Sequence, residues 1–131
     1  MHPFRAAVEA GDLSNAGHLL AEDVVFTSPV VFKPYHGREV TAAILAAVEQ
    51  VFEDFRYIRE IGAEDASDHA LVFKATVSGR ELEGCDFIHT NAEGLIDQFT
   101  VMVRPLSGAK ALQEQMAIKF EEIQRQMAAG S

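Results

Sequence analysis

The feature that most constrains the fold is a run with a hydrophobic period of two, which begins after Phe55 and continues to Val103. Alternate side chains of an extended strand point to opposite faces, so this period predicts β-strands. We expect four strands, over residues 55–61, 71–77, 82–90 and 95–103. Turn residues at positions 78–79 and 91–94 join the last three strands. Consecutive hairpins of this kind predict a largely antiparallel sheet.

Helical patterns flank the predicted sheet. Val40, Ile44, Val48 and Val51 form one apolar stripe, which predicts a helix over residues 38–52. The other expected elements are a short helix at residues 3–10, a second helix after Asp12, a strand at residues 24–27, a loop at residues 28–37 and a final helix at residues 109–127. The 131 residues therefore predict a single α+β domain over residues 1–131, with helices laid on one face of the sheet.

Charge and composition exclude several classes of partner. The formal net charge of -9 disfavours nucleic acid and anionic membrane surfaces. No segment approaches the ~20 apolar residues that span a bilayer, and the N-terminal residues do not resemble a signal peptide. The one cysteine, Cys85, excludes an intrachain disulfide, and the histidines lack metal-ligand spacing. We expect a cytoplasmic protein with no metal and no cofactor.

The predicted strands carry apolar residues on both faces. Cys85 and Phe87 lie on one face of the strand at residues 82–90, and Leu82 and Ile88 lie on the other. A sheet with one face in water alternates more cleanly than this. We expect helices to cover one face and a second copy of the chain to cover the other, which predicts a homodimer. The alternative is that the C-terminal helix folds across the second face within one chain.

Three runs carry a resemblance to a known superfamily: DVVFTSP at residues 23–29, YHGRE at residues 35–39, and DFIH at residues 86–89 followed by EGLI at residues 93–96. In this order they resemble the nuclear transport factor 2-like (NTF2-like) superfamily, in its SnoaL-like and ketosteroid-isomerase-like branch. The resemblance implies a cone-shaped, curved, mostly antiparallel sheet that is covered by helices and surrounds an apolar cavity, and commonly a dimer. It leaves the function open, because this fold hosts isomerases, cyclases, hydrolases and binding proteins.

The resemblance can be carried over residue by residue. The carboxylate base of ketosteroid isomerases corresponds to Ser28, and their tyrosine donor in the first helix corresponds to Phe4. Their protonated aspartate donor corresponds to Asp86. A serine hydroxyl does not act as a general base unaided, and Phe4 offers no hydrogen bond to an enolate. The familiar ketosteroid isomerase mechanism is therefore not expected.

Asp86 is the leading candidate for a catalytic or anchoring group. It shares strand parity with Leu82 and Ile88, so it points to an apolar side, where burial raises the pKa of a carboxyl group. Such a group could orient a ligand's carbonyl or act as an acid. The alternative is a structural carboxylate that is bonded to Arg104, a tyrosine or a hydroxyl. His36 is the second catalytic candidate, as the partner of Asp86 in an acid–base couple.

The remaining candidates are ligand-binding residues of the expected cavity, from strand parity, the loop and the resemblance. They are Phe4, Ser28, Tyr35, Phe73, Phe99, Val101 and Val103. The first interpretation is a SnoaL-like small-molecule-binding protein that takes an apolar ligand, with Asp86 as the polar anchor. The first alternative is an isomerase, polyketide-cyclase-like or hydrolase enzyme that uses Asp86 as acid or base. The second is a protein-interaction module with a vestigial cavity.

Overall fold

The computed structural model describes residues 1–129, apart from the side chains of Ser14, Asn15 and Met127. Its helices are α1 (Pro3–Glu9), the 3-10 helix η1 (Leu13–Leu19), α2 (Arg38–Val51) and α3 (Leu106–Ala129). Its strands are β1 (Leu20–Thr27), β2 (Tyr35–His36), β3 (Glu53–Ile61), β4 (Asp68–Val77), β5 (Arg80–Thr90) and β6 (Ile96–Arg104).

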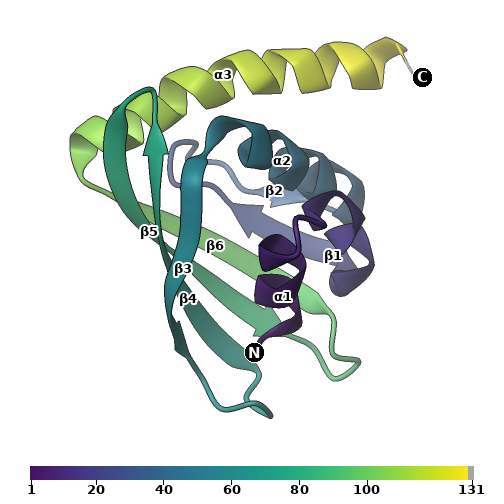
Figure 1. Cartoon of the computed structure of the whole chain (residues 1–131). Helices are drawn as coiled ribbons and strands as arrows, with labels where there is room; N and C mark the ends of the chain where they lie inside the picture. The colour runs from purple at the N-terminus through teal and green to yellow at the C-terminus, as the bar shows by residue number, and fades with distance from the viewer. Residues whose placement is uncertain (130–131) are drawn as a thin grey trace.

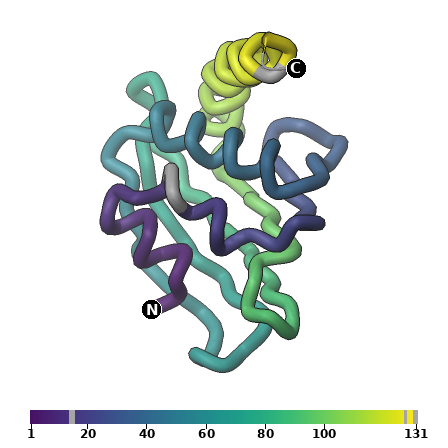
Figure 2. Tube along the Cα trace, turned by 90° about the vertical axis from the view of Figure 1, so that its right-hand side faces the viewer, coloured from purple at the N-terminus to yellow at the C-terminus, as the bar shows by residue number. Residues whose placement is uncertain are grey.

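The strands form one six-stranded sheet in the order β2-β1-β6-β5-β4-β3. The pairing of β1 with β6 is parallel and the other pairings are antiparallel. Figure 1 shows the sheet curving around the helices, with α3 across the top and α1 near the bottom. In the perpendicular view of Figure 2, α3 is again at the top and the purple α1 lies below it. The predicted α+β fold with a curved, mostly antiparallel sheet is confirmed.

The turn between β4 and β5 sets the register of the sheet at the site. Val77 pairs with Arg80, so the loop has two residues, as the sequence predicts. Ser78 and Gly79 have φ angles of 50° and 77°. Positive φ at both central residues is typical of the turn whose twist matches that of a two-stranded ribbon. From this turn the pairs run in register to Asp68 opposite His89, which fixes the face to which each side chain of β5 points.

Three local predictions differ from the structure. The segment after Asp12 is a 3-10 helix, and Leu20 begins a strand because it pairs with Ile96 of β6. Tyr35 and His36 are not loop residues, since they pair with Phe26 and Val25 at the sheet edge. Pairing with a neighbouring strand, which no local pattern reports, decides these cases.

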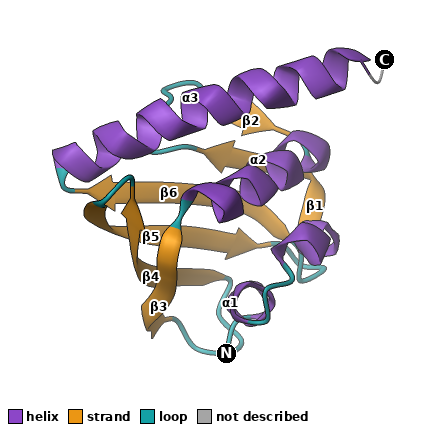
Figure 3. Ribbon diagram, turned by 45° about the horizontal axis from the view of Figure 1, so that its top comes forward, coloured by secondary structure: helices purple, strands orange, loops and turns teal. Residues whose placement is uncertain are grey.

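Helix α3 begins at Leu106, earlier than the predicted residue 109. Gly108 lies in its first turns against Leu82 of β5, where an added Cβ atom would come within 2.8 Å of the Leu82 Cβ. The glycine therefore lets the start of the helix approach the strand closely. Figure 3 shows α3 running diagonally over the sheet from this point.

The three α-helices lie on the inner, concave face of the sheet. Leu112 and Met116 of α3 are buried in the same core as Phe73 of β4. The alternative in which the C-terminal helix covers the outer face is therefore wrong. On that outer face Phe87 and Met102 remain 44% and 59% exposed in the single chain. No helix among the described residues is long and apolar enough to cross a membrane.

Candidate functional site

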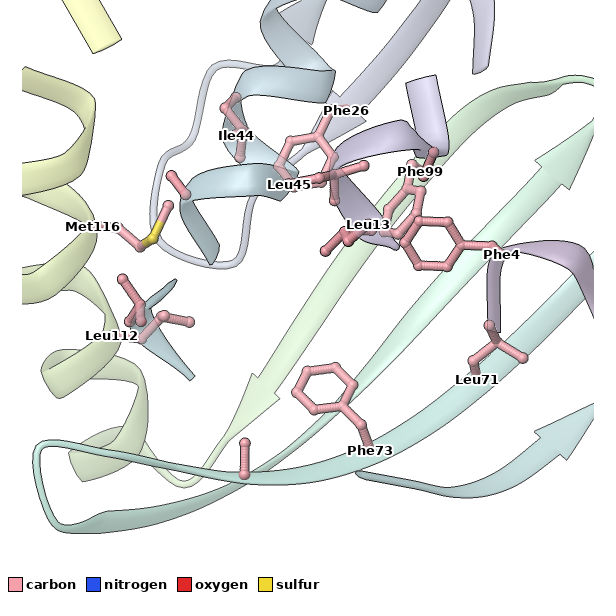
Figure 4. Close-up of a cluster of buried hydrophobic side chains, with 14 of the residues drawn as sticks. Phe4, Leu13, Phe26, Ile44, Leu45, Leu71, Phe73, Phe99, Leu112 and Met116 are labelled. Atoms are coloured by element: carbon pink, nitrogen blue, oxygen red, sulfur yellow. The ribbon is translucent and has the colours of Figure 1, made fainter. Parts of the chain in front are cut away.

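A cavity of about 380 Å³ lies between the concave face of the sheet and the helices. Figure 4 shows Phe4 from α1, Phe73 from β4 and Met116 from α3 pointing toward the same central space. Eight of the eleven aromatic residues of the chain line this cavity: Phe4, Phe26, Phe52, Phe55, Tyr57, Phe73, Phe99 and Phe120. Its volume falls in the range of small-molecule sites, and its wall is predominantly apolar.

The aromatic residues form two groups on the wall. Phe99 lies edge-to-face on Phe4, with the ring centres 4.9 Å apart, and contacts Phe26 at 5.5 Å. In the second group Phe55 stacks on Phe73 at 4.8 Å and meets Tyr57 edge-to-face at 5.0 Å. Such contacts fix ring orientations, so the walls of the cavity are preformed.

Gly84 gives the Phe73 ring its position. The two residues are opposite each other on β5 and β4. A Cβ atom at position 84 would lie 2.3 Å from the Phe73 Cζ and 2.9 Å from the Met102 carbonyl oxygen. Because any larger side chain would displace the ring, the glycine is a steric requirement of this wall.

Asp86 is the buried ionisable group of the cavity wall. It is 6% exposed and stands opposite Leu71 on β4 and Val101 on β6, so apolar side chains flank it on both sides. The Tyr57 hydroxyl donates a hydrogen bond to the Asp86 Oδ2 at 2.8 Å. Tyr57 is the one described side chain that bonds to this carboxyl group, so the second oxygen, Oδ1, has no hydrogen-bond partner among the described residues. A ligand in the cavity could therefore bond to it.

Burial changes the protonation of this pair. It raises the pKa of Asp86 to about 7, and the hydrogen bond from Tyr57 opposes part of this rise. Burial, together with the neighbouring Asp86 carboxylate, raises the pKa of Tyr57. Tyr57 therefore keeps its proton at neutral pH, while Asp86 is close to half ionised and can either accept or donate a proton.

The exposed residues of the lining mark the mouth of the cavity. They are Glu9 at the end of α1, Glu49 near the end of α2, and Arg56 on β3. Glu9 is paired with Arg5 at 2.8 Å. The mouth therefore lies where these three elements meet and is bordered by charged groups of both signs.

Helix α1, which covers one side of the cavity, is fastened to β3 by polar contacts. The His2 Nδ1 accepts a hydrogen bond from the Phe4 backbone N–H at 3.0 Å and caps the helix. Glu60 of β3 accepts a bond from the His2 backbone N–H at 3.1 Å and also contacts Arg5. These contacts hold the buried Phe4 ring in the cavity wall.

The structure brings six of the predicted site residues to the cavity: Asp86, Phe4, Ser28, Phe73, Phe99 and Val101. Val103 packs on the core without lining the cavity. Tyr35 packs on Phe120, which lines the cavity, but does not line it itself. His36 is exposed on β2 and is neither in the lining nor bonded to Asp86. The predicted His36–Asp86 couple is therefore not assembled in this structure.

Tyr57 is a polar site residue that the sequence analysis did not single out. The period of two that it shares with Phe55 placed it on the inner face of the sheet. Its bond to Asp86 joins residues 29 positions apart, which a local pattern does not predict. Arg104, the basic partner considered for Asp86, instead lies 3.8 Å from Glu83. The structural alternative for Asp86, a bond to a tyrosine, is thus present together with the cavity.

Neither a metal cluster nor an activated thiol is found among the described residues. Within the described part of the chain, no group of three or more His, Cys, Asp or Glu side chains is placed to hold a metal ion. Cys85 alternates away from Asp86 and lies on the outer face opposite Met102. Its pKa is raised by burial and by the nearby carboxylate, which disfavours the reactive thiolate.

The cone-shaped fold and its aromatic cavity define a protein of the NTF2-like class. The chain belongs to the SnoaL-like domain family, whose profile matches residues 2–99. A steroid delta-isomerase from Pseudomonas aeruginosa is 41% identical, with a TM-score of 0.86 over 93% of this chain and 89% of that one. An uncharacterized cystatin-like-fold protein from Silicibacter pomeroyi is 38% identical, with a TM-score of 0.88 over 98% and 92%.

More distant structures share the fold alone. An NTF2-like protein of unknown function from Mesorhizobium loti is 16% identical, with a TM-score of 0.66 over 78% of this chain and 85% of that one. The comparison with curated proteins gave no match. The support for a small-molecule-binding or isomerase role comes from membership of the SnoaL-like family and from the likeness to the steroid delta-isomerase.

Proposed function

We propose that the protein binds an apolar small molecule in its aromatic cavity, with Asp86 as the polar anchor. The observation that carries this proposal is the Tyr57–Asp86 pair in the cavity wall, which leaves one carboxylate oxygen without a partner among the described residues. Aromatic walls supply most of the binding free energy, and a single polar group fixes the ligand's orientation.

A second candidate is an isomerase that uses Asp86 as both acid and base. Its support is the pKa of about 7, because a group that is half ionised at neutral pH can take a proton from one position and return it to another. The likeness to the Pseudomonas aeruginosa steroid delta-isomerase favours this reaction class. The route would differ from the familiar one, because Phe4 and Ser28 stand where that mechanism has tyrosine and carboxylate.

The third interpretation, an interaction module, has less support. A vestigial cavity should be filled by the protein's own side chains, whereas this one retains about 380 Å³.

Ser28 offers a second polar group to a ligand in the cavity. Its Oγ accepts a hydrogen bond from the Val30 backbone N–H at 3.1 Å and keeps its own hydroxyl proton available to a ligand.

The binding proposal is tested with N-phenyl-1-naphthylamine, a neutral apolar dye that fluoresces in apolar sites. One saturable site for each chain is expected. Met116→Trp, which places an indole in the cavity, should weaken binding at least about tenfold because the dye and the indole compete for one volume. Ile118→Trp, at a half-exposed position of the same helix, is the matched control and should bind like the wild type. Undiminished binding by Met116→Trp would place the dye elsewhere and overturn the proposal.

A homodimer through the outer face of the sheet belongs to the same proposal. Phe87 and Met102 form an exposed apolar pair on that face, which a second copy would cover. Sedimentation equilibrium at micromolar concentration should give twice the mass of one chain. Phe87→Glu should give the single-chain mass, because it would bury a charge in the interface. Phe32→Glu, at a position that is 98% exposed, should leave the dimer intact. A monomeric wild type contradicts this assembly.

A further inference from the structure

The charge of the cavity lining constrains the class of ligand more closely than the shape of the cavity does. Of the described residues that line the cavity, Asp86 is the one ionisable carboxylate that is buried, and the one basic residue, Arg56, is exposed at the mouth. The Arg56 Nη1 donates a hydrogen bond to the Asp54 carbonyl oxygen at 2.9 Å and not to Asp86. The buried part of the cavity therefore offers a negative group with no positive group of the protein bonded to it.

The aromatic cluster begins one hydrogen bond away from this carboxylate. Tyr57, which donates to Asp86, meets the ring of Phe55, and Phe55 in turn stacks on Phe73. Faces of aromatic rings attract cations through their quadrupole, most strongly where water is excluded. A buried carboxylate that is hydrogen-bonded to one member of an aromatic cluster is the chemistry that recognises an organic cation.

We propose that the ligand is an apolar amine whose protonated nitrogen pairs with the Asp86 Oδ1 and lies against the aromatic faces of Phe55 and Tyr57. This inference rests on the proposed binding function and names the ligand class of the same cavity. A neutral ligand leaves the ionised Asp86 without a counter-charge, and a carboxylate ligand adds a second negative charge beside it.

The surroundings of Asp86 support the amine over the other two classes. Its flanking residues, Leu71 and Val101, are apolar, and the pKa of about 7 reflects a charge that lacks a partner. A bound ammonium group supplies that partner and favours the ionised carboxylate. The formal net charge of -9 also attracts cations to the molecule and repels anions.

Arg5 and Glu9 are the other titratable groups that act on the Tyr57–Asp86 pair from α1. Tyr57 on β3 bonds to Asp86 directly, and Arg5 and Glu9 on α1 act on Tyr57 with opposite signs. Arg5 lies over the Tyr57 ring at 5.8 Å and is itself paired with Glu9 and Glu60. Its charge is thus offset by two carboxylates, so it does not neutralise Asp86.

The test compares three probes with one apolar skeleton. They are 1-naphthylmethylamine, 1-naphthylmethanol and 1-naphthoate, which carry a cationic, a neutral and an anionic group. The chain has no tryptophan, so naphthalene fluorescence can be followed without indole background. We expect the amine to bind at least about tenfold more tightly than the alcohol, and the naphthoate to bind most weakly.

The pH dependence gives an independent readout. A primary alkylamine stays protonated well above neutrality (pKa ~10), so a change near pH 7 reports the protein. The affinity for the amine should rise about tenfold between about pH 6 and about pH 8, as Asp86 ionises. The affinity for the alcohol should not rise over this interval.

Matched variants separate the anchor from the general charge of the protein. Asp86→Asn should remove the preference for the amine and its pH dependence while the alcohol still binds. Asp97→Asn changes the net charge equally but lies outside the cavity, where it pairs with His89, and should keep the preference. Phe55→Leu should lower the affinity for the amine at least about threefold more than that for the alcohol. Circular dichroism of each variant confirms folding.

The outcomes distinguish this inference from the proposed function. If the alcohol or the naphthoate binds as tightly as the amine, the inference is overturned and the binding function stands. An equal preference for the amine in Asp86→Asn also overturns it, because the cation would then be held elsewhere. Failure of all three probes, together with failure of the neutral dye, would remove the proposed function itself.

Discussion

Asp86→Asn is expected to gain about 4 kcal/mol of unfolding free energy relative to the wild type as the pH rises from below 4 to above 8. The reason is the folded-state pKa of about 7, which burial has raised from an ordinary value of 3.8. The native protein must carry an ionised carboxylate among apolar side chains at high pH, whereas the unfolded chain exposes it to water. Asparagine keeps the acceptor oxygen for Tyr57 and carries no charge.

The sign of the effect follows from proton binding. Between about pH 4 and pH 7 the native state holds a proton on Asp86 that the unfolded state has released, so the free energy of unfolding falls as the pH rises. The contribution of Asp86 to stability is complete below the unfolded pKa and is lost through the folded pKa. Outside this window the native and unfolded states bind the same number of protons at Asp86. The free energies of unfolding of the two proteins should then change with pH in parallel.

Urea unfolding at a series of pH values measures this difference, and subtraction of the two curves removes the titration of all other groups. Asp97→Asn is a control whose effect falls in a different pH interval, above the ordinary histidine pKa of 6.5. The bond to Asp97 raises the pKa of His89, so that pair stabilises the protein at acid pH and its contribution fades as the pH rises. A constant difference between Asp86→Asn and the wild type would show that Asp86 is solvated in the native state.

The sequence was sufficient to place Asp86 but not its partner. The period of two in β5 is a local pattern, and it put Asp86 inward and Cys85 outward as the structure has them. The bond from Tyr57 depends on the alignment of β3 with β4, which shifts between Tyr57 and Arg59. The sequence carries no signal of this register shift. The period of two therefore placed Tyr57 on the inner face but did not predict its bond to Asp86.

The sequence did not predict how far the cavity extends along a strand, for a related reason. Val101 and Val103 share a parity, yet Val101 lines the cavity and Val103 does not. Parity gives the face of a sheet, while the extent of a cavity along a strand depends on which helices cover it. The two-residue strand of Tyr35 and His36 is too short to show any periodicity, and only its pairing with β1 reveals that His36 lies at the sheet edge.

Phe99→Ala is expected to lower the free energy of unfolding by about 3–5 kcal/mol, a large share of the ~5–15 kcal/mol of a typical domain. Phe99 is 1% exposed and joins Phe4 of α1 to Phe26 of β1 through its ring contacts. Its loss removes one of the contacts that hold α1 against the sheet. The void would merge with the existing cavity, which the surrounding helices already hold open, so collapse offsets little of the cost.

Phe32→Ala is the matched control for this substitution, because it deletes the same ring at a position that is 98% exposed. It should change the free energy of unfolding by less than about 0.5 kcal/mol. Chemical unfolding of the three proteins without ligand gives both differences. Equal, small effects of the two substitutions would mean that the Phe99 ring is not part of a packed wall. The aromatic surface that is proposed to hold the ligand would then not be preformed.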